Sequence, residues 1–497
     1  MNEGYILAID QSTSGTKALI IDNQGRIISA KAVSHQQIYP QSGWVEHDPM
    51  EIYENVKKVI NESVQTTGDR TGKWKALTIT NQRETVVVWD KQTGAPVYNA
   101  IVWQCRRTAG ICAALKEQGC EEKVRSKTGL TMDPYFSGTK VKWILDHVPG
   151  ARAKAEKGEL LLGTIDSWLI WKLTKGNVHA TDITNASRTL LYNIYSLSWD
   201  DELLQLFTIP KSMFPEVKFS DEIYGNVKDA AINLPELPIS GVVGDSQAAL
   251  FAQQCFEKGM AKATFGTGTS FMVYTDKWQT GNRGLVTSVA WGFNSNVHYA
   301  LEGIIHTTGD VIKWMKEDLA LFSDFAEAEA LAEKLDGNDG VYVVPAFVGL
   351  GAPYWRPDAR AAIVGMSRNT NRSHLIRAGL ESIVYQVKDV IQLIYDDAGV
   401  PVKQLRVDGG ATSNDFLLRF LADILHMDVI VSNVSELSAL GSAYLGGLGI
   451  GMWDSVEDIK RLKRTGRTFK PKMSQQSRSN YYQGWKKAVS SVLNINI

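Results

Sequence analysis

The chain has 497 residues, and its 53 Lys and Arg against 54 Asp and Glu leave a formal net charge of −1. This length exceeds what one hydrophobic core usually serves, so two or three domains are expected. With 44% hydrophobic and 22% charged residues the chain has the composition of a globular protein, not of a disordered or fibrous one. The balanced charge gives no bulk attraction to nucleic acid or to an anionic membrane. Any phosphate must therefore be bound by a local site.

The cysteine pattern predicts neither a structural zinc site nor a disulfide scaffold, which makes a reducing cytoplasm the simpler location. The apolar run at the beginning of the chain ends at Asp10 and lacks a basic region, so it is not expected to be a signal peptide. Later uncharged stretches, 341–355 and 437–453, are short or interrupted by Gly and Pro. No membrane span is expected. The cysteines are Cys105, Cys112, Cys120 and Cys255.

Strand-like and helix-like segments alternate along the chain, which predicts an α/β fold. Apolar residues 5–9, a turn of small residues and a second apolar run at 17–21 predict an opening hairpin, and the turn at 22–25 predicts a third strand. Asp48 is placed to cap a helix that begins at Pro49 and is amphipathic.

The opening pattern recurs near the middle of the chain. Residues 239–244 predict a strand that runs into Asp245, and a helix follows. Residues 262–274 then repeat the order of strand, hydroxyl-rich turn and strand, which predicts two related halves joined near residue 250. We expect lobes at 1–250, with the substrate and the first phosphate turn, and at 251–497, with the nucleotide.

Two turns are candidates for binding phosphate, because small residues let backbone N–H groups approach it and hydroxyls add donors. They are Ser12–Lys17 and Gly266–Thr269. Each turn alone is more readily explained as an ordinary hairpin, and Lys17 as a solvated surface charge. Together, in matching halves, the two turns favour a phosphate site. A strand that ends at Gly409-Gly410 before Asn414 either accommodates a flat adenosine or is an ordinary strand-to-helix turn.

Six longer motifs are specific beyond their local pattern: Trp44–Pro49, Asn81–Thr85, Ile101–Arg107, Asp133–Trp143, Gly349–Trp355 and the stretch 361–381. They resemble motifs of the FGGY family of carbohydrate kinases, to which the glycerol kinases belong, and the resemblance covers the chain from about Ile6 to about Val489. It implies an α/β fold of two actin-like, ribonuclease H-like lobes around a cleft, and a magnesium-dependent transfer of phosphate from ATP to a primary hydroxyl of glycerol.

The resemblance also implies roles for individual residues. A polyol hydroxyl both donates and accepts hydrogen bonds, so a guanidinium and carboxylates complement it. Asp245, whose alternative role is a helix N-cap, is expected to be the general base, and Asp10 and Asp245 to lie next to Mg²⁺. The implied polyol residues are Arg83, Glu84, Trp103, Tyr135 and Asp245. The implied nucleotide residues are Thr13, Ser14, Lys17, Thr267, Gly309, Gly410 and Asn414.

The chain departs from the family pattern at three positions that bear on binding. Ser246 replaces a glutamine and Ser270 a phenylalanine among the expected polyol residues, and Lys313 replaces a glutamine near the nucleotide. Smaller side chains predict a wider, wetter pocket, so a kinase for a larger polyol or ketose is the first alternative. A non-catalytic actin-like nucleotide-binding protein is the second. A homodimer or homotetramer is expected by resemblance alone.

Overall fold

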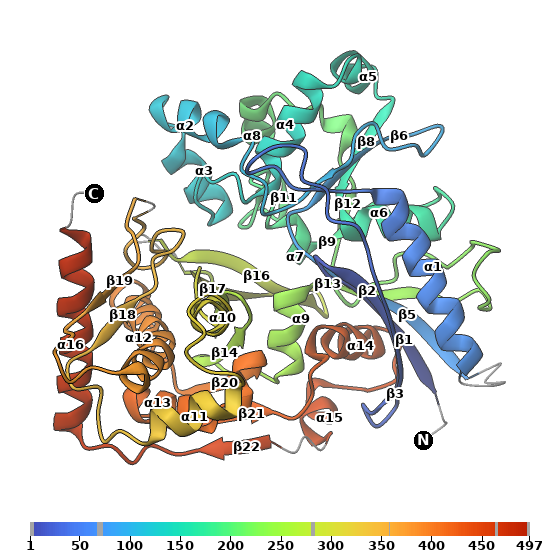
Figure 1. Ribbon diagram of the computed structural model, residues 1–497. Coiled ribbons are helices and arrows are strands. Elements are labelled where there is room, and N and C mark those ends of the chain that lie inside the picture. Colours follow the sequence, from blue (N-terminus) through green and yellow to red (C-terminus); the bar gives the residue numbers. More distant parts are fainter. Residues whose placement is uncertain (1–3, 67–72, 280–283, 357, 463–465, 495–497) are drawn as a thin grey trace. The chain divides into compact units, whose positions relative to one another are not determined.

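The computed structural model describes residues 4–66, 73–279, 284–356, 358–462 and 466–494. By compactness the chain divides into two units, each assembled from three segments (Figure 1). The first unit comprises 1–254, 287–299 and 436–463, and the second comprises 255–286, 300–435 and 464–497.

This division differs from the predicted lobes 1–250 and 251–497 in two later segments. The largest difference is helix α14 (Leu437–Gly449), which belongs to the first unit. Its Ser442 hydroxyl lies 3.1 Å from the Thr78 hydroxyl, and a side chain at Gly446 would collide with Thr78. The helix therefore packs directly on the first sheet, although nearly two hundred residues separate it from the last strand of that sheet.

The first unit is built on a sheet with strand order β13-β5-β1-β2-β3. Strands β1, β5 and β13 are parallel, whereas β2 is antiparallel to both β1 and β3. This arrangement confirms the predicted opening hairpin and third strand. The bounds are β1 (Tyr5–Gln11), β2 (Gly15–Asp22), β3 (Ile27–Ser34), β5 (Trp74–Asn81) and β13 (Ile239–Gly244).

Helices cover both faces of this sheet, because successive side chains of a strand point to opposite sides. Leu7 and Ile9 share a buried cluster with Ile52 and with other residues of α1 (Pro49–Thr66). Ile6, on the other face, lies next to Gly447 of α14, which Figure 1 shows in dark red beside the blue strands. The Asp48 carboxylate accepts a hydrogen bond of 2.8 Å from the Met50 N–H, which confirms the predicted cap of α1.

A long insertion separates β5 from β13 in the chain. Its strands β6, β7 and β8 join β4, which precedes α1 in the chain, in a sheet of order β4-β7-β6-β8, and two small two-stranded sheets accompany it. The strands are β4 (Glu46–His47), β6 (Val86–Asp90), β7 (Ala100–Ile101), β8 (Leu160–Thr164), β9 (Ala180–Asp182), β10 (Tyr192–Asn193), β11 (Ser198–Trp199) and β12 (Glu216–Lys218). The helices are α2 (Ala109–Glu117), α3 (Glu121–Thr128), α4 (Ser137–His147), α5 (Ala151–Glu156), α6 (Ile165–Leu173), α7 (Ile183–Ala186), α8 (Asp201–Phe207) and the short η1 (Lys211–Met213).

The sheet of the second unit repeats the first. Its order β21-β20-β14-β15-β17 matches β13-β5-β1-β2-β3, with β14, β20 and β21 parallel and β15 antiparallel to β14. The shared strand order is the repeat of strand, turn and strand that the sequence predicts. The strands are β14 (Met260–Phe265), β15 (Thr269–Thr275), β17 (Asn296–Ile305), β20 (Gln404–Gly409), β21 (Val429–Ser432) and the added edge strand β22 (Gly466–Phe469).

The remaining elements are helices, the separate strand pair β18-β19, and β16, which adjoins β17 in the sheet order. A buried cluster joins β14, β15 and β20 to the long helix α12, which forms the core of the second unit. Within the described part of the chain, no helix is both long and apolar enough to cross a membrane. The remaining elements are α9 (Asp245–Ala252), β16 (Val286–Phe293), α10 (Gly309–Glu317), α11 (Phe325–Glu333), β18 (Tyr342–Val344), β19 (Ala362–Val364), α12 (Arg372–Ala398), η2 (Gly410–Ser413), α13 (Asp415–Leu425), α15 (Val456–Arg461) and α16 (Gln475–Leu493).

Candidate active site

The predicted polyol residues of the first unit cluster where three parallel strands end. Strand β1 ends just beyond Asp10, β5 is followed by Arg83 and Glu84, and β13 is followed by Asp245. Parallel strands present their carboxyl ends at the same edge of a sheet, and ligands of α/β proteins commonly bind at that edge. The fold therefore brings together residues that lie more than two hundred positions apart in the sequence.

Arg83 is the link between the carboxylates at this edge. Its Nε lies 3.3 Å from Oδ1 of Asp245 and 3.9 Å from Oε1 of Glu84, and its Nη1 donates to Gln247. The Arg83 side chain is only 5% exposed, whereas that of Asp245 is 37% exposed. Arg83 is thus held by its neighbours, and the Asp245 carboxylate remains open to a ligand.

Asp245 is not the N-cap of the helix that follows it, which was the alternative role considered from the sequence. Gly244 is the N-cap of α9, and Asp245 is the first helical residue. Its Oδ1 accepts a hydrogen bond of 2.6 Å from the backbone N–H of Ser246. A negative charge in the first turn of a helix interacts favourably with the helix dipole.

An aromatic wall lies beside the first phosphate turn. The rings of Trp103 and Tyr135 are 5.3 Å apart, and the Trp103 Nε1–H donates a hydrogen bond of 2.9 Å to the Thr13 hydroxyl. The buried ammonium of Lys140 donates to the backbone carbonyls of Pro134, Tyr135 and Phe136. Lys140, which sequence reasoning did not single out, fixes the backbone that carries Tyr135.

The first phosphate turn is supported from below by side-chain amides. Gln11 and Gln37 donate to the carbonyls of Ser12 and Thr13 at 2.8 and 2.9 Å. Ser14 is exposed at the tip of the turn. These hydrogen bonds fix the carbonyls of Ser12 and Thr13, so the turn is stabilised in one conformation. Ser14, which is exposed, is accessible to a ligand.

Lys17 is paired with a residue that sequence reasoning missed. Its Nζ lies 2.8 and 2.9 Å from the two carboxylate oxygens of Glu436, the N-cap residue of α14. Lys17 is directly opposite Asp10 in the pairing of β1 with β2. Burial, followed by repulsion from Asp245, raises the pKa of Asp10 from 3.8 to about 7, with Glu436 adding to the rise and Lys17 opposing it.

The predicted residues of the second unit lie at the corresponding strand ends. The backbone N–H of Gly309 donates to Gly266 at 3.0 Å and that of Asp310 to Thr267 at 3.2 Å, so α10 begins directly on the second hydroxyl-rich turn. A side chain at Gly309 would lie 2.5 Å from the carbonyl oxygen of Gly266. Only glycine allows this close approach.

The Gly-Gly turn after β20 is open on one side. A side chain at Gly410 would meet no other atom within 4 Å, which leaves room for a flat group against the backbone. Asn414 caps α13 by accepting a hydrogen bond of 2.8 Å from Leu417. Ser270 lies on β15 with its hydroxyl 3.3 Å from Lys262, and Lys313 is exposed beside Glu317 on α10.

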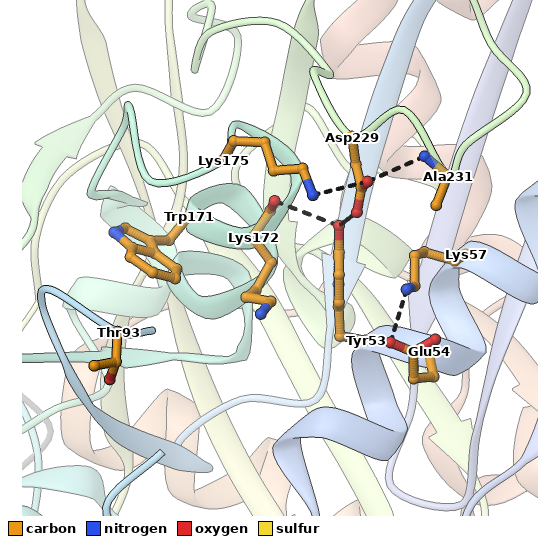
Figure 2. Close-up of a pocket in the computed structure, with 9 residues that line it drawn as sticks. All are labelled: Tyr53, Glu54, Lys57, Thr93, Trp171, Lys172, Lys175, Asp229 and Ala231. Carbon is orange, nitrogen blue, oxygen red and sulfur yellow. Dashed lines mark hydrogen bonds and ion pairs between the residues drawn. The ribbon is translucent and has the colours of Figure 1, made fainter. Parts of the chain in front are cut away.

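A separate cavity of about 380 Å³ lies elsewhere in the first unit, and no predicted site residue lines it (Figure 2). Ion pairs occupy its walls: Lys175 with Asp229 at 2.9 Å and Lys57 with Glu54 at 2.7 Å. The Tyr53 hydroxyl donates to the same Asp229 carboxylate. The side chains that line this cavity therefore contact one another. At the sheet edge, by contrast, the Asp245 carboxylate is accessible to a ligand.

Comparisons with known proteins agree with this arrangement. Residues 5–252 match the N-terminal domain of the FGGY family of carbohydrate kinases, and residues 261–450 match its C-terminal domain. The chain belongs to the FGGY family of carbohydrate kinases. The predicted family, fold class and ATP-dependent kinase activity are thereby confirmed.

Within this family, the chain is similar over its whole length to proteins named glycerol kinase. It is 52% identical to that of Halothermothrix orenii over 494 residues, which is 99% of both chains, and 51% identical to that of Bacillus licheniformis over 98% of this chain and 99% of the relative. The crystal structure of Plasmodium falciparum glycerol kinase with ADP has a TM-score of 0.95 at 38% identity, over 100% of this chain and 99% of the other.

Proposed function

We propose that the protein transfers the terminal phosphoryl group of ATP to a primary hydroxyl of glycerol, giving sn-glycerol 3-phosphate and ADP. The observation that carries the proposal is the edge at which Arg83 lies 3.3 Å from the open carboxylate of Asp245 and beside Glu84. The names of the relatives, which are similar over nearly the whole chain, support glycerol as the alcohol.

The polyol residues provide two kinds of contact, hydrogen bonds to hydroxyls and apolar surface for carbon atoms. Arg83 is a fixed donor and Glu84 a fixed acceptor, so together they satisfy a hydroxyl that both accepts and donates. Trp103 and Tyr135 provide the apolar surface for the carbon chain, with their rings 5.3 Å apart. Glycerol would thus be oriented with its reacting hydroxyl toward Asp245.

Asp245 acts as the general base in this proposal. Phosphoryl transfer passes through a loose transition state, so alignment of the alcohol and neutralisation of charge matter more than a strong base. The carboxylate accepts the proton of the attacking hydroxyl as the new O–P bond forms. Lys17 and the backbone N–H groups of the turn around Thr13 and Ser14 stabilise negative charge on the phosphoryl oxygens.

Asp10 and Asp245 are proposed to hold Mg²⁺ together with the nucleotide. They suit a hard cation, because both supply carboxylate oxygens. Among the described residues no group of three or more His, Cys, Asp and Glu could hold a metal, so phosphate oxygens and water would complete the ligands. When bound, the ion neutralises charge on the phosphates.

The nucleotide residues of the second unit are proposed from the same family pattern. Thr267 lies in the hydroxyl-rich turn, whose hydroxyl suits phosphate, and Gly309 holds the start of α10 against that turn. Gly410 has the open face that an adenine requires, and Asn414 lies just beyond it. Lys313, on the exposed side of α10, is proposed to contact the nucleotide as well.

A coupled assay of ADP release tests the proposed function. The purified chain, with ATP and Mg²⁺, is expected to release ADP when glycerol is added and to release little with erythritol, dihydroxyacetone or pentitols. Omission of Mg²⁺ should abolish the signal. A clear preference for a four- or five-carbon substrate, by kcat/KM, would assign the enzyme to the larger polyols or ketoses instead.

The substitution Ser246→Gln tests the wider pocket. A glutamine next to Asp245 would restore one hydrogen bond to a substrate hydroxyl, and such a bond contributes about 0.5–1.5 kcal/mol. We expect the KM for glycerol to fall by about 3- to 10-fold while the KM for ATP is unchanged. An unchanged or higher glycerol KM would mean that position 246 does not face the substrate, and Ser270 would then have to account for the altered pocket alone.

Cytoplasmic location and self-association remain proposals of the same kind. Four free cysteines are compatible with a reducing compartment. We propose a homodimer or homotetramer, which sedimentation velocity at several protein concentrations would distinguish from a monomer.

A further inference from the structure

Glu84 is held in a conformation that a glutamate rarely adopts. Its φ angle is +61°, in the left-handed region that is costly for residues other than glycine. The Ser137 hydroxyl donates a hydrogen bond of 2.9 Å to its backbone carbonyl, and its side chain is only 1% exposed. Such backbone strain persists only where surrounding contacts enforce it, and it is common at ligand sites.

The contact that holds the Glu84 carboxylate comes from Arg188, just after helix α7. The Arg188 Nε–H donates to Oε1 of Glu84 at 2.5 Å, and Nη1 donates to the Ser288 hydroxyl at 2.7 Å. The guanidinium also lies 5.9 Å from the ring centre of Tyr135 and 5.1 Å from that of Phe136. The Arg188 side chain is completely buried, so its charge acts on neighbouring protein groups and not on solvent.

Arg188 therefore contacts two of the proposed polyol residues, Glu84 through a hydrogen bond and Tyr135 through its ring. Its planar guanidinium has donors in fixed directions, so a contact at Nε and another at Nη1 determine the orientation of the group. The same Oε1 of Glu84 is 3.9 Å from Nε of Arg83. The side chains of Arg83 and Arg188 thus both approach the Oε1 atom of Glu84.

We propose that Arg188 is a positioning residue for polyol specificity: by fixing the Glu84 carboxylate and the Tyr135 ring, it determines which substrate hydroxyl can accept and donate at that point. The inference rests on the proposed polyol site. If Arg188 had a purely structural role and only neutralised a buried charge, its substitution would lower stability without raising the KM for glycerol more than the KM for ATP.

The main test is Arg188→Lys, compared with Arg377→Lys as a matched control. Arg377 also donates from Nε to a buried glutamate, Glu381, at 2.8 Å, but in the second unit and with no predicted site residue among its partners. Lysine keeps the charge and loses the fixed fork in both variants. For Arg188→Lys we expect the glycerol KM to rise about tenfold, the ATP KM to stay within about twofold, and kcat to change less than the glycerol KM.

The control variant is expected to lose a comparable amount of thermal stability with both KM values within about twofold of wild type. The inference is overturned if Arg188→Lys folds with an unchanged glycerol KM, or if Arg377→Lys raises the glycerol KM equally. Ser288→Ala provides a milder variant, because it removes only the second anchor of Arg188; a rise of about threefold in glycerol KM is expected. If Arg188→Lys does not fold, an unchanged glycerol KM in Ser288→Ala overturns the inference.

Turnover by the wild-type enzyme distinguishes a failure of the Arg188 inference from a failure of the proposed function. If the wild type does not phosphorylate glycerol, the proposed substrate is wrong, and the same variants are then compared on whichever polyol of the panel is turned over. Arg188 retains its positioning role if its variants raise the KM for that polyol selectively.

Discussion

Asp245→Asn is expected to lower kcat by about 100- to 10,000-fold, while the KM for ATP stays within about twofold of wild type. Asparagine has nearly the shape of aspartate, so the first turn of α9 is retained. It cannot accept the proton of the attacking hydroxyl, and it removes the charge that faces Nε of Arg83 at 3.3 Å. Steady-state kinetics with varied ATP and varied glycerol would separate these effects.

Asp201→Asn is the matched control for this experiment. Asp201 also lies in the first turn of a helix, α8, in the same unit, and its carboxylate is exposed and paired with Lys211 at 2.7 Å. Surface substitutions of this kind change stability by less than about 0.5 kcal/mol. We expect wild-type kinetics from Asp201→Asn. Activity of Asp245→Asn within about tenfold of wild type would eliminate Asp245 as the base.

Asp10→Asn is expected to have opposite effects on activity and on stability. It removes a proposed magnesium ligand, so kcat should fall by about 100-fold or more. Mg²⁺ should also cease to add to the thermal stabilisation that ADP gives, because the ion would have lost one of its two carboxylates. An Mg²⁺-dependent shift in Tm as large as that of the wild type would contradict the role of Asp10 as a ligand.

The stability effect follows from the raised pKa of Asp10, about 7 in the folded protein against an ordinary 3.8. The folded state binds this proton more tightly than the unfolded state, so the contribution of Asp10 is complete below about pH 4 and is lost as pH rises through about 7. At pH 8 the wild type must carry a buried charge that Asp10→Asn lacks. Without ligands, the variant should therefore melt a few degrees higher at pH 8, and the difference should shrink toward pH 4.

Asp90→Asn supplies a control of opposite sign. Hydrogen bonds from the Thr93 backbone and from Lys154 lower the pKa of Asp90 to about 2. Its stabilising contribution is present above the ordinary pKa and is lost as pH falls, so Asp90→Asn should lower Tm slightly at pH 8. Melting curves from pH 4 to 8 should separate the two variants. A lower Tm for Asp10→Asn at pH 8 would contradict the burial of an ionised Asp10.

Local chemistry made much of the fold predictable. The hairpin turns after Asp10 and after Phe265, and the cap at Asp48, depend on residues within a few positions of each other, and the structure has them as predicted. The repeat could also be predicted, because each half begins with a strand, a turn and a strand that are close together in the sequence. Family motifs extended this prediction to the residues around Arg83 and Asp245, which the fold gathers at one sheet edge.

Long-range partners were not predictable in this way. Glu436 pairs with Lys17 across 419 positions, and Arg188 with Glu84 across 104. Neither has a local pattern, because an isolated acidic or basic residue in a sequence is most often a solvated charge. The placement of α14 on the first sheet had no sequence signal either, because an apolar helix does not specify which sheet it covers.

The sequence by itself determined the elements, the repeat, the family and the identity of the residues that suit a polyol and a phosphate. Only the tertiary structure decided which charges meet: Arg83 with Asp245, Lys17 with Glu436, and Arg188 with Glu84. The physical reason is range. Turns and caps are set by neighbours along the chain, whereas ion pairing and burial depend on neighbours in space, which are fixed only once the strands have paired and the helices have packed.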